Sequence, residues 1–232
     1  MIEVGPYRFS ANDALSTVGH VDDFLDAYPD GAQQELEGLR AELQSLADGA
    51  DPVDVVATIF PKLLSARDGA QRAGVLPATT TGSVAQLNAS EGGVPKLPVD
   101  QVEVDFGGIT VDSQRNRVHH GRPFQALCLW SAEIIDQLVA DGHPIFPGAA
   151  GENLTLSGFD WPSLTMGTQV RAGEVLMQIT AHAVPCGHQK QWFTDGDFSR
   201  LHHENGDISR LYATVIEPGV INTGDAAVVE PT

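Results

Sequence analysis

Positive charge is scarce in this sequence. Its 232 residues include 13 lysine and arginine residues against 31 aspartate and glutamate residues, and the formal net charge is -18. An acidic surface of this kind repels the phosphate backbone of nucleic acids and the headgroups of anionic membranes. We therefore expect neither nucleic acid nor a membrane as a partner.

Cysteines and long apolar runs are also scarce. Two cysteines, Cys128 and Cys186, are too few for a disulfide scaffold and are usual for a reducing compartment, although a bridge between them stays open. No stretch approaches the roughly 18 apolar residues of a membrane span, and the N-terminus lacks a basic start followed by an apolar run. We expect a cytoplasmic protein.

Several common motifs of enzymes are missing. The sequence has no Cys-x-x-Cys pair, no phosphate-binding P-loop, no Rossmann glycine fingerprint and no Gly-x-Ser-x-Gly elbow. Cys186, His188, His202 and His203 do not have the spacing of a structural zinc site. Zinc is therefore not expected, and neither is pyridoxal phosphate, since nothing suggests a Schiff-base lysine pocket.

The first third of the chain has helical patterns. Residues 13 to about 75 are expected to be helical, with leucines from Leu36 to Leu46 at three- and four-residue steps. A second helix is expected to start at Asp51-Pro52 and to kink or end at Pro61. We interpret residues 1–80 as an N-terminal helical segment of unknown role, through whose helices the protein could form oligomers.

The rest of the chain, 81–232, has short segments of alternating apolar and polar residues between glycine-rich turns. This pattern predicts a mostly antiparallel, closed β-barrel, so the fold class is α+β overall and mainly β. The expected strands are 101–106, 123–130, 174–184, 210–217 and 226–230. One helix is expected between them, with Ser131 as its N-cap, a buried stripe of Ile134, Ile135, Leu138 and Val139, and an end at Gly142.

Cys186 is the leading candidate for chemistry. It follows Pro185 at the end of the clearest strand, where a barrel strand turns into a loop. His188 and Lys190 follow, and positive neighbours favour the thiolate that attacks electrophiles or binds soft metals. The alternative is a buried, inert cysteine. That alternative fits Cys128 better, because Cys128 lies in an apolar run without a charged neighbour.

Two further segments could hold an anion. In 147–154, Gly148 and Gly151 free the backbone to turn its amides toward a ligand, next to Glu152 and Asn153, although such loops are often mere connections. Residues 112–123 carry Arg115, Arg117, Arg122, His119 and His120 against the single Asp112, and Lys96 is one of only three lysines. This positive island suits a phosphate; a solvated loop is the alternative.

In order along the chain, these pieces resemble the MOSC family, the domain named after the C-terminal part of molybdenum cofactor sulfurase. The resemblance covers about 82 to 230, and its most specific part is Gly-Glu-Asn at 151–153 followed by Pro-Cys at 185–186. It implies a β-barrel in which Cys186 binds the molybdenum of a molybdopterin cofactor or carries a persulfide. It also implies that Lys96, His120, Glu152 and Asn153 surround the cofactor pocket.

The cofactor-binding set is thus expected to comprise Lys96, His119, His120, Arg122, Gly151, Glu152 and Asn153. Arg122 stands where many relatives have glycine, and Ala183 where one branch has an arginine. Three functions stay open. These are a molybdenum enzyme that reduces N-hydroxylated compounds with a separate electron-donor protein, a sulfur carrier served by a cysteine desulfurase, and a non-catalytic binding module.

Overall fold

The computed structural model describes residues 1–10, 13, 51–115 and 120–231. The leucine-rich segment from Leu36 to Leu46 and the candidate residue His119 lie outside the described residues. Among the described helices, none is long and apolar enough to cross a membrane.

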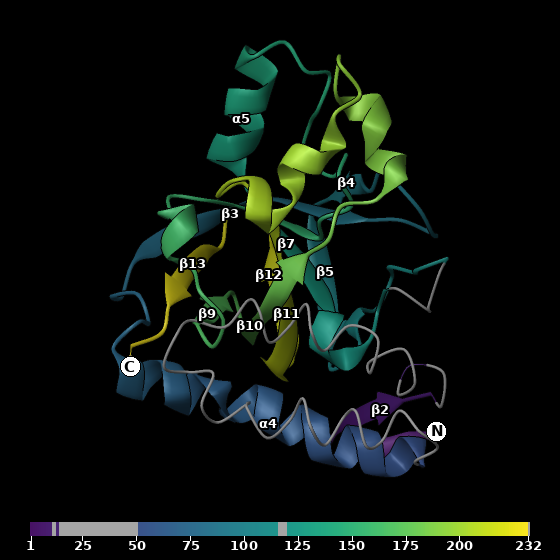
Figure 1. Cartoon of the computed structure of the whole chain (residues 1–232), viewed down its shortest axis with the longest axis vertical. Helices are drawn as coiled ribbons and strands as arrows, with labels where there is room; N and C mark the ends of the chain where they lie inside the picture. The colour runs from purple at the N-terminus through teal and green to yellow at the C-terminus, as the bar shows by residue number, and fades with distance from the viewer. Residues whose placement is uncertain (11–12, 14–50, 116–119, 232) are drawn as a thin grey trace.

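Seven strands close into a barrel, which confirms the expected architecture (Figure 1). Strand β13 pairs with both β9 and β3 and so completes the ring. Every pairing in it is antiparallel except that of β7 with β8. In order of pairing the strands are β13 (Ala226–Val229), β9 (Gln169–Ala172), β10 (Val175–Ala183), β11 (Arg210–Glu217), β7 (Leu127–Ser131), β8 (Leu154–Ser157) and β3 (Thr81–Ala89). The short strand β4 (Leu97–Val99) adds to β3 outside the ring.

Two of the expected barrel strands differ in the structure. Residues 101–106 were expected in the barrel, but β5 (Gln101–Asp105) forms a separate sheet with β6 (Gly108–Ile109) and β12 (Gly219–Asn222). The segment 123–130 begins as a 3-10 turn, Pro123–Gln125, and becomes β7 only at Leu127. Proline has no N–H for a strand ladder, which explains the late start.

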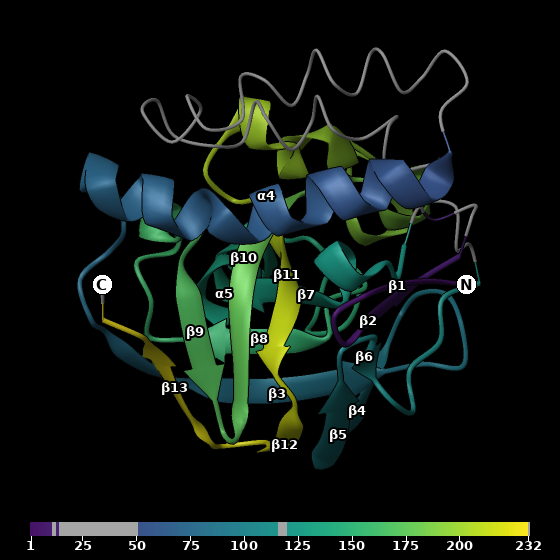
Figure 2. The same cartoon turned by 90° about the horizontal axis from the view of Figure 1, so that it is seen from below.

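Helix α4 (Pro52–Ala73) lies across the outside of the barrel (Figure 2). Asp51 caps its N-terminus by accepting a hydrogen bond from the Val53 N–H at 3.0 Å, as the sequence predicted. Of the two outcomes expected at Pro61, a kink or an end, the end is wrong. The helix continues for three turns beyond Pro61, and its buried face includes Phe60 and Leu63, whose packing outweighs the hydrogen bond that proline cannot make.

This helix covers the outer face of β10. Gln178 on β10 donates from Nε2 to the backbone oxygens of Leu64 at 3.0 Å and Leu63 at 3.4 Å. Residues 175–181 are therefore buried on both faces.

The N-terminus forms a hairpin that precedes the residues expected to be helical and was not predicted. Strands β1 (Ile2–Val4) and β2 (Tyr7–Phe9) pair beside α4. The Tyr7 hydroxyl donates to the Val215 backbone oxygen on β11 at 2.8 Å. One hydrophobic core includes side chains of this hairpin, of α4 and of the barrel.

Helix α5 (Ala132–Ala140) begins where it was expected, with Ser131 accepting a hydrogen bond from the Ile134 N–H. Ile135 and Leu138 are buried, but Val139 is 48% exposed, so its place in the buried stripe is wrong. A 3-10 turn (Trp161–Ser163) follows β8, and between β10 and β11 three more form a lobe above the barrel: Gly187–Trp192, Phe198–Leu201 and His203–Asn205.

Candidate functional site

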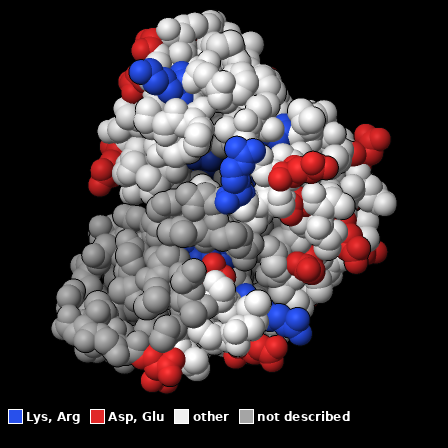
Figure 3. All heavy atoms as spheres, turned by 90° about the vertical axis from the view of Figure 1, so that its right-hand side faces the viewer, with Lys and Arg blue, Asp and Glu red and all other residues white. Residues whose placement is uncertain are grey.

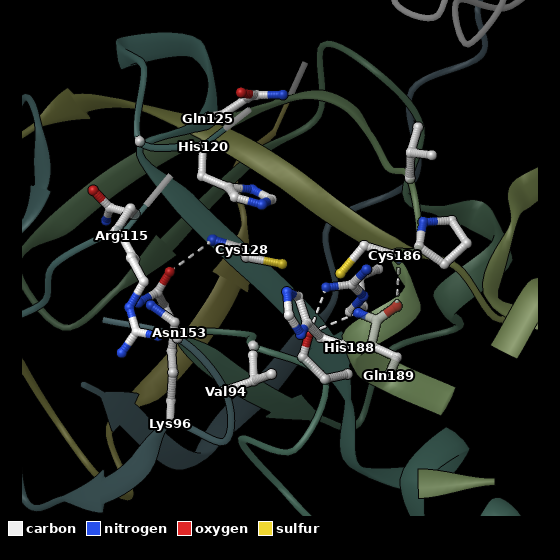
Figure 4. A pocket seen from close by; sticks show the side chains of 18 of the residues that line it. Val94, Lys96, Arg115, His120, Gln125, Cys128, Asn153, Cys186, His188 and Gln189 are labelled. Atoms are coloured by element: carbon white, nitrogen blue, oxygen red, sulfur yellow. Dashed lines mark hydrogen bonds between the residues drawn. The ribbon is translucent and has the colours of Figure 1, made fainter. Parts of the chain in front are cut away.

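A cavity of about 1160 Å³ lies beside Cys186 at the end of β10. This volume is slightly above the usual range for ligand pockets, roughly 300 to 1,000 Å³. Figure 3 shows a hollow, with basic side chains beside it, on one face of the molecule. The chemically active residues that line the cavity are Lys96, Arg115, His120, Cys128, Asn153, His182, Cys186, His188, Arg210 and Tyr212, and Figure 4 labels several of them.

The Cys186 backbone is held on both sides of the thiol. Pro185 precedes it, and Gln189 follows in the first 3-10 turn of the lobe. The Cys186 N–H donates to Gln189 Oε1 at 3.0 Å, and the Gln189 N–H donates to the Cys186 oxygen at 3.0 Å. Gln189 is buried and also donates from Nε2 to the Ala150 oxygen at 2.9 Å. The half-buried thiol is thereby placed against the glycine-rich loop.

Cys128 is buried, as expected, but it also lines the same cavity. Burial raises the pKa of its thiol to about 11, although the Arg210 guanidinium beside it acts in the opposite direction. The local sequence shows no such charged neighbour, because Arg210 lies on the adjacent strand β11. Cys128 therefore stays a neutral thiol at ordinary pH, and Cys186 is the accessible one.

Lys96 does not present an uncompensated charge to the cavity. Its ammonium forms an ion pair with Asp112, and both side chains are buried. Asp112 also accepts hydrogen bonds from Asn153 Nδ2 at 3.0 Å and from the Ser90 N–H at 2.9 Å. Asp112 thus organises Lys96 and Asn153 into one wall of the cavity and neutralises part of the expected positive island.

Asn153 and Gly151 line the cavity, whereas Glu152 is not among its lining residues. Glu152 is fully buried and accepts a hydrogen bond from the Gly148 N–H at 2.5 Å. Burial raises the pKa of its carboxyl to about 7. Gly148 has a φ of 90°, and a Cβ there would lie 2.3 Å from the Lys96 backbone oxygen, so this turn requires glycine.

Of the other predicted residues, one lines the cavity and one does not. His120 lines the cavity, and its Nδ1 lies 3.2 Å from the Tyr212 hydroxyl. Arg122 is fully buried, donates from Nε to Gln125 Oε1 at 2.9 Å and lies over the Phe124 ring. It is not among the lining residues, so its contacts are with the protein itself.

The sequence analysis did not assign three of the cavity-lining residues to the site. Arg210 and Tyr212 lie on β11, where Arg210 pairs directly with Ala183 of β10. The register of β11 against β10 cannot be read from a local sequence pattern. His182 had a possible signal, because it lies four residues before Cys186. In the structure it stacks on His203 with ring centroids 4.7 Å apart, and His203 stacks on His202 at 4.6 Å.

Cys186 is a potential metal ligand at this site. No group of three or more histidine, cysteine, aspartate or glutamate side chains in the described ranges could hold a metal ion. Cys186 could supply one sulfur ligand.

The fold and site define a barrel protein with one accessible cysteine at a strand end, beside a cavity that several charged and polar side chains line. Residues 116–228 match the family model described as MOSC domain. The chain is similar to Protein YiiM of Escherichia coli (strain K12), with 30% identity over 138 residues, which cover 56% of this chain and 59% of YiiM. The uncharacterized protein YflK of Bacillus subtilis (strain 168) is 27% identical over 49% of this chain and 51% of its own length.

The chain therefore spans little more than half the length of these curated relatives. Among solved structures, the YUAD protein from Bacillus subtilis superposes with a TM-score of 0.55 at 19% identity, covering 66% of this chain and 98% of that one. This likeness concerns the fold alone.

Proposed function

We propose that this protein binds a molybdenum cofactor of the molybdopterin type, with the Cys186 thiolate as a ligand of the metal. The observation that supports this most directly is the position of Cys186, an accessible thiol held by Gln189 beside a cavity of about 1160 Å³. The match of residues 116–228 to the MOSC domain model, whose name refers to this cofactor, supports the same function.

The residues of the cavity fit such a group. A pterin with a phosphate tail needs cationic and hydrogen-bonding contacts. His120, Arg115 and Arg210 line the cavity and can supply positive charge or donors, while Asn153 and the backbone at Gly151 line it from the glycine-rich loop. Cys186 would bind the metal, and Gln189 would fix the direction of its thiol through the Cys186 backbone.

When bound, the cofactor supplies two-electron chemistry at the metal. Reduction of an N-hydroxylated compound, the reaction we propose, takes up two electrons and two protons and releases water. The sequence has no iron-sulfur cysteine set and no flavin or nicotinamide fingerprint, so a separate electron-donor protein is proposed as a partner.

The test is molybdenum content. The full chain and its Cys186→Ala variant are purified from cells supplied with molybdate, with Cys128→Ala as the matched control. We expect near-stoichiometric molybdenum in the wild type and in Cys128→Ala, and little in Cys186→Ala. Absence of molybdenum from all three proteins would contradict the proposal.

Sulfur transfer is the second candidate, because the same accessible thiol could carry a persulfide. Cys128 is buried and neutral at ordinary pH, so Cys186 would be the sulfur-accepting residue. A gain of one sulfur atom on Cys186 after incubation with a cysteine desulfurase and cysteine would support this function. If neither molybdenum nor persulfide sulfur is found on Cys186, the results favour a binding module without this chemistry.

A further inference from the structure

Arg210 is a buried cation on the cavity wall. It is 5% exposed, lies at the start of β11 and lines the same cavity as Cys186. Its cross-strand partner is Ala183, three residues before Cys186. Directly paired residues project from the same face of a sheet, so Arg210 and Ala183 share the face at this end of the barrel.

The charge of Arg210 is not neutralised by the described part of the chain. Its NH1 donates to the Ala150 backbone oxygen at 2.6 Å, and its Nε has no hydrogen-bond partner. No carboxylate in the described ranges lies within ion-pair distance of its guanidinium. Glu152 is near enough to interact electrostatically with Arg210, but its hydrogen bonds are with Gly148 and Thr155.

Lys96 makes an instructive contrast, because it is the other buried cation of this cavity. Lys96 has Asp112 as its counterion, whereas the Arg210 guanidinium bonds to a carbonyl oxygen and lies beside the Cys128 thiol, with Glu152 nearby but not bonded to it. Buried charges in folded proteins are normally paired, because an unpaired one loses hydration without compensation. An arginine left unpaired on a cavity wall is suited to an anion that comes from outside the chain.

We propose that Arg210 binds an oxyanion group, a phosphate or a carboxylate, of the molecule held in the Cys186 cavity. This inference deepens the proposed function, since the anion belongs either to the cofactor or to its substrate. Arg210 has two amino groups and an Nε on one planar fork, a geometry that matches two oxygens of such a group.

The experiment measures the binding of inorganic phosphate by calorimetry, together with the phosphate-dependent rise in melting temperature. The protein is the full chain from cells grown without added molybdate and shown to be free of molybdenum. Variants are Arg210→Gln and Arg210→Lys. The matched control is Arg171→Gln, which removes an arginine that is paired with Glu217 and Glu230 away from the cavity.

We expect Arg210→Gln to weaken phosphate binding by about tenfold or more, with Arg210→Lys in between and Arg171→Gln unchanged. Without phosphate, Arg210→Gln is expected to melt no lower than the wild type, because it removes an unpaired buried charge. A purely structural arginine would instead give a lower melting temperature and unchanged phosphate binding. Equal binding in wild type and Arg210→Gln, or no binding in either, overturns the proposal.

A second arm separates the two sources of the anion. Wild-type protein loaded with molybdenum is titrated with phosphate in the same way. Loss of phosphate binding on loading assigns Arg210 to the phosphate of the cofactor, whereas retained binding assigns it to an anionic substrate. Phosphate binding that depends on Arg210 in a protein that never takes up molybdenum would support this inference while the proposed function fails.

Discussion

Gln189 joins the cysteine turn to the glycine-rich loop. Its Oε1 accepts from the Cys186 N–H at 3.0 Å, and its Nε2 donates to the Ala150 oxygen at 2.9 Å. One buried amide therefore fixes how the end of β10 faces the loop before Asn153.

Replacing Gln189 by alanine should destabilise the protein by about 1 to 3 kcal/mol, because the partly buried Cys186 N–H loses its acceptor. Urea denaturation monitored by circular dichroism measures this. The control is Gln191→Ala, an exposed residue that bonds to the His188 oxygen, for which a change within about 0.5 kcal/mol is expected. Equal losses in the two variants would show that the Gln189 bridge has no special role.

The two cysteines should differ sharply in reactivity. Cys186 is half-buried at the cavity, whereas Cys128 is buried with a pKa raised to about 11. Because the thiolate is the reacting form, iodoacetamide at pH 8 should modify only Cys186 in the folded protein and both cysteines in urea. Intact-mass measurements on wild type, Cys186→Ser and Cys128→Ser distinguish the sites. Labelling of folded Cys186→Ser at the wild-type rate would contradict this expectation.

Local patterns in the sequence were enough to find β10 and the cysteine that follows it. The strand was expected at 174–184 and spans Val175–Ala183, because alternation of apolar residues is a property of a single strand. The hairpin β1–β2 was missed, since strands of three residues are too short to show a period. Its stability depends on α4 and the barrel, which are distant in sequence.

The site was harder to predict than the fold. Lys96 and Asn153 line the cavity as the resemblance implied, but their shared partner Asp112 had been counted only as an opposing charge. Arg210 enters the cavity through the pairing of β11 with β10, which no local pattern contains. The Glu152 side chain points toward the Gly148 backbone and accepts a hydrogen bond from its N–H. This orientation depends on how the loop turns in the folded protein.

The buried Glu152 carboxyl should make stability depend on pH. Burial raises its pKa from 4.5 to about 7, so the folded state holds the proton more tightly than the unfolded state. Its contribution to stability is therefore full below about pH 4.5 and decreases as the pH rises toward 7, by up to about 3 kcal/mol. Glu152→Gln keeps an oxygen for the Gly148 N–H and cannot ionise.

Urea denaturation at pH 5 and pH 8 tests this dependence. Relative to Glu152→Gln, the wild type should lose stability between the two values. Subtracting the free energy of unfolding of Glu152→Gln from that of the wild type at each pH removes the contribution of the histidines. Parallel pH profiles of wild type and Glu152→Gln would show that the Glu152 carboxyl titrates alike in the folded and unfolded states.

The stacked histidines should make stability depend on pH in the opposite direction. Burial, together with His203 and His202, lowers the pKa of His182 from 6.5 to about 4. The unfolded state therefore binds the proton more tightly, and stability rises as the pH increases from about 4 to 6.5. His182→Phe keeps a flat ring against His203 without a titrating group, so it should lose less stability than wild type between pH 7 and pH 5. A steeper loss in His182→Phe would contradict this assignment.

The last prediction concerns whether residues 1–80 form a unit separate from the barrel. The Phe60 ring on α4 packs edge to face against Tyr7 at 4.5 Å and Phe9 at 5.2 Å, within the core shared with the barrel. Phe60→Ala should cost about 3 to 5 kcal/mol, whereas Val53→Ala, at a half-exposed position of the same helix, should change stability by about 0.5 kcal/mol or less.

Because the core is shared, the unfolding of Phe60→Ala should remain one transition. Far-ultraviolet circular dichroism reports on α4, and fluorescence reports on the buried tryptophans Trp130 and Trp161 of the barrel region. Coincident urea curves would mean that the hairpin and α4 fold together with the barrel. An early loss of helical signal, with the tryptophan signal unchanged, would mean that the boundary expected near residue 81 separates two independently folding units.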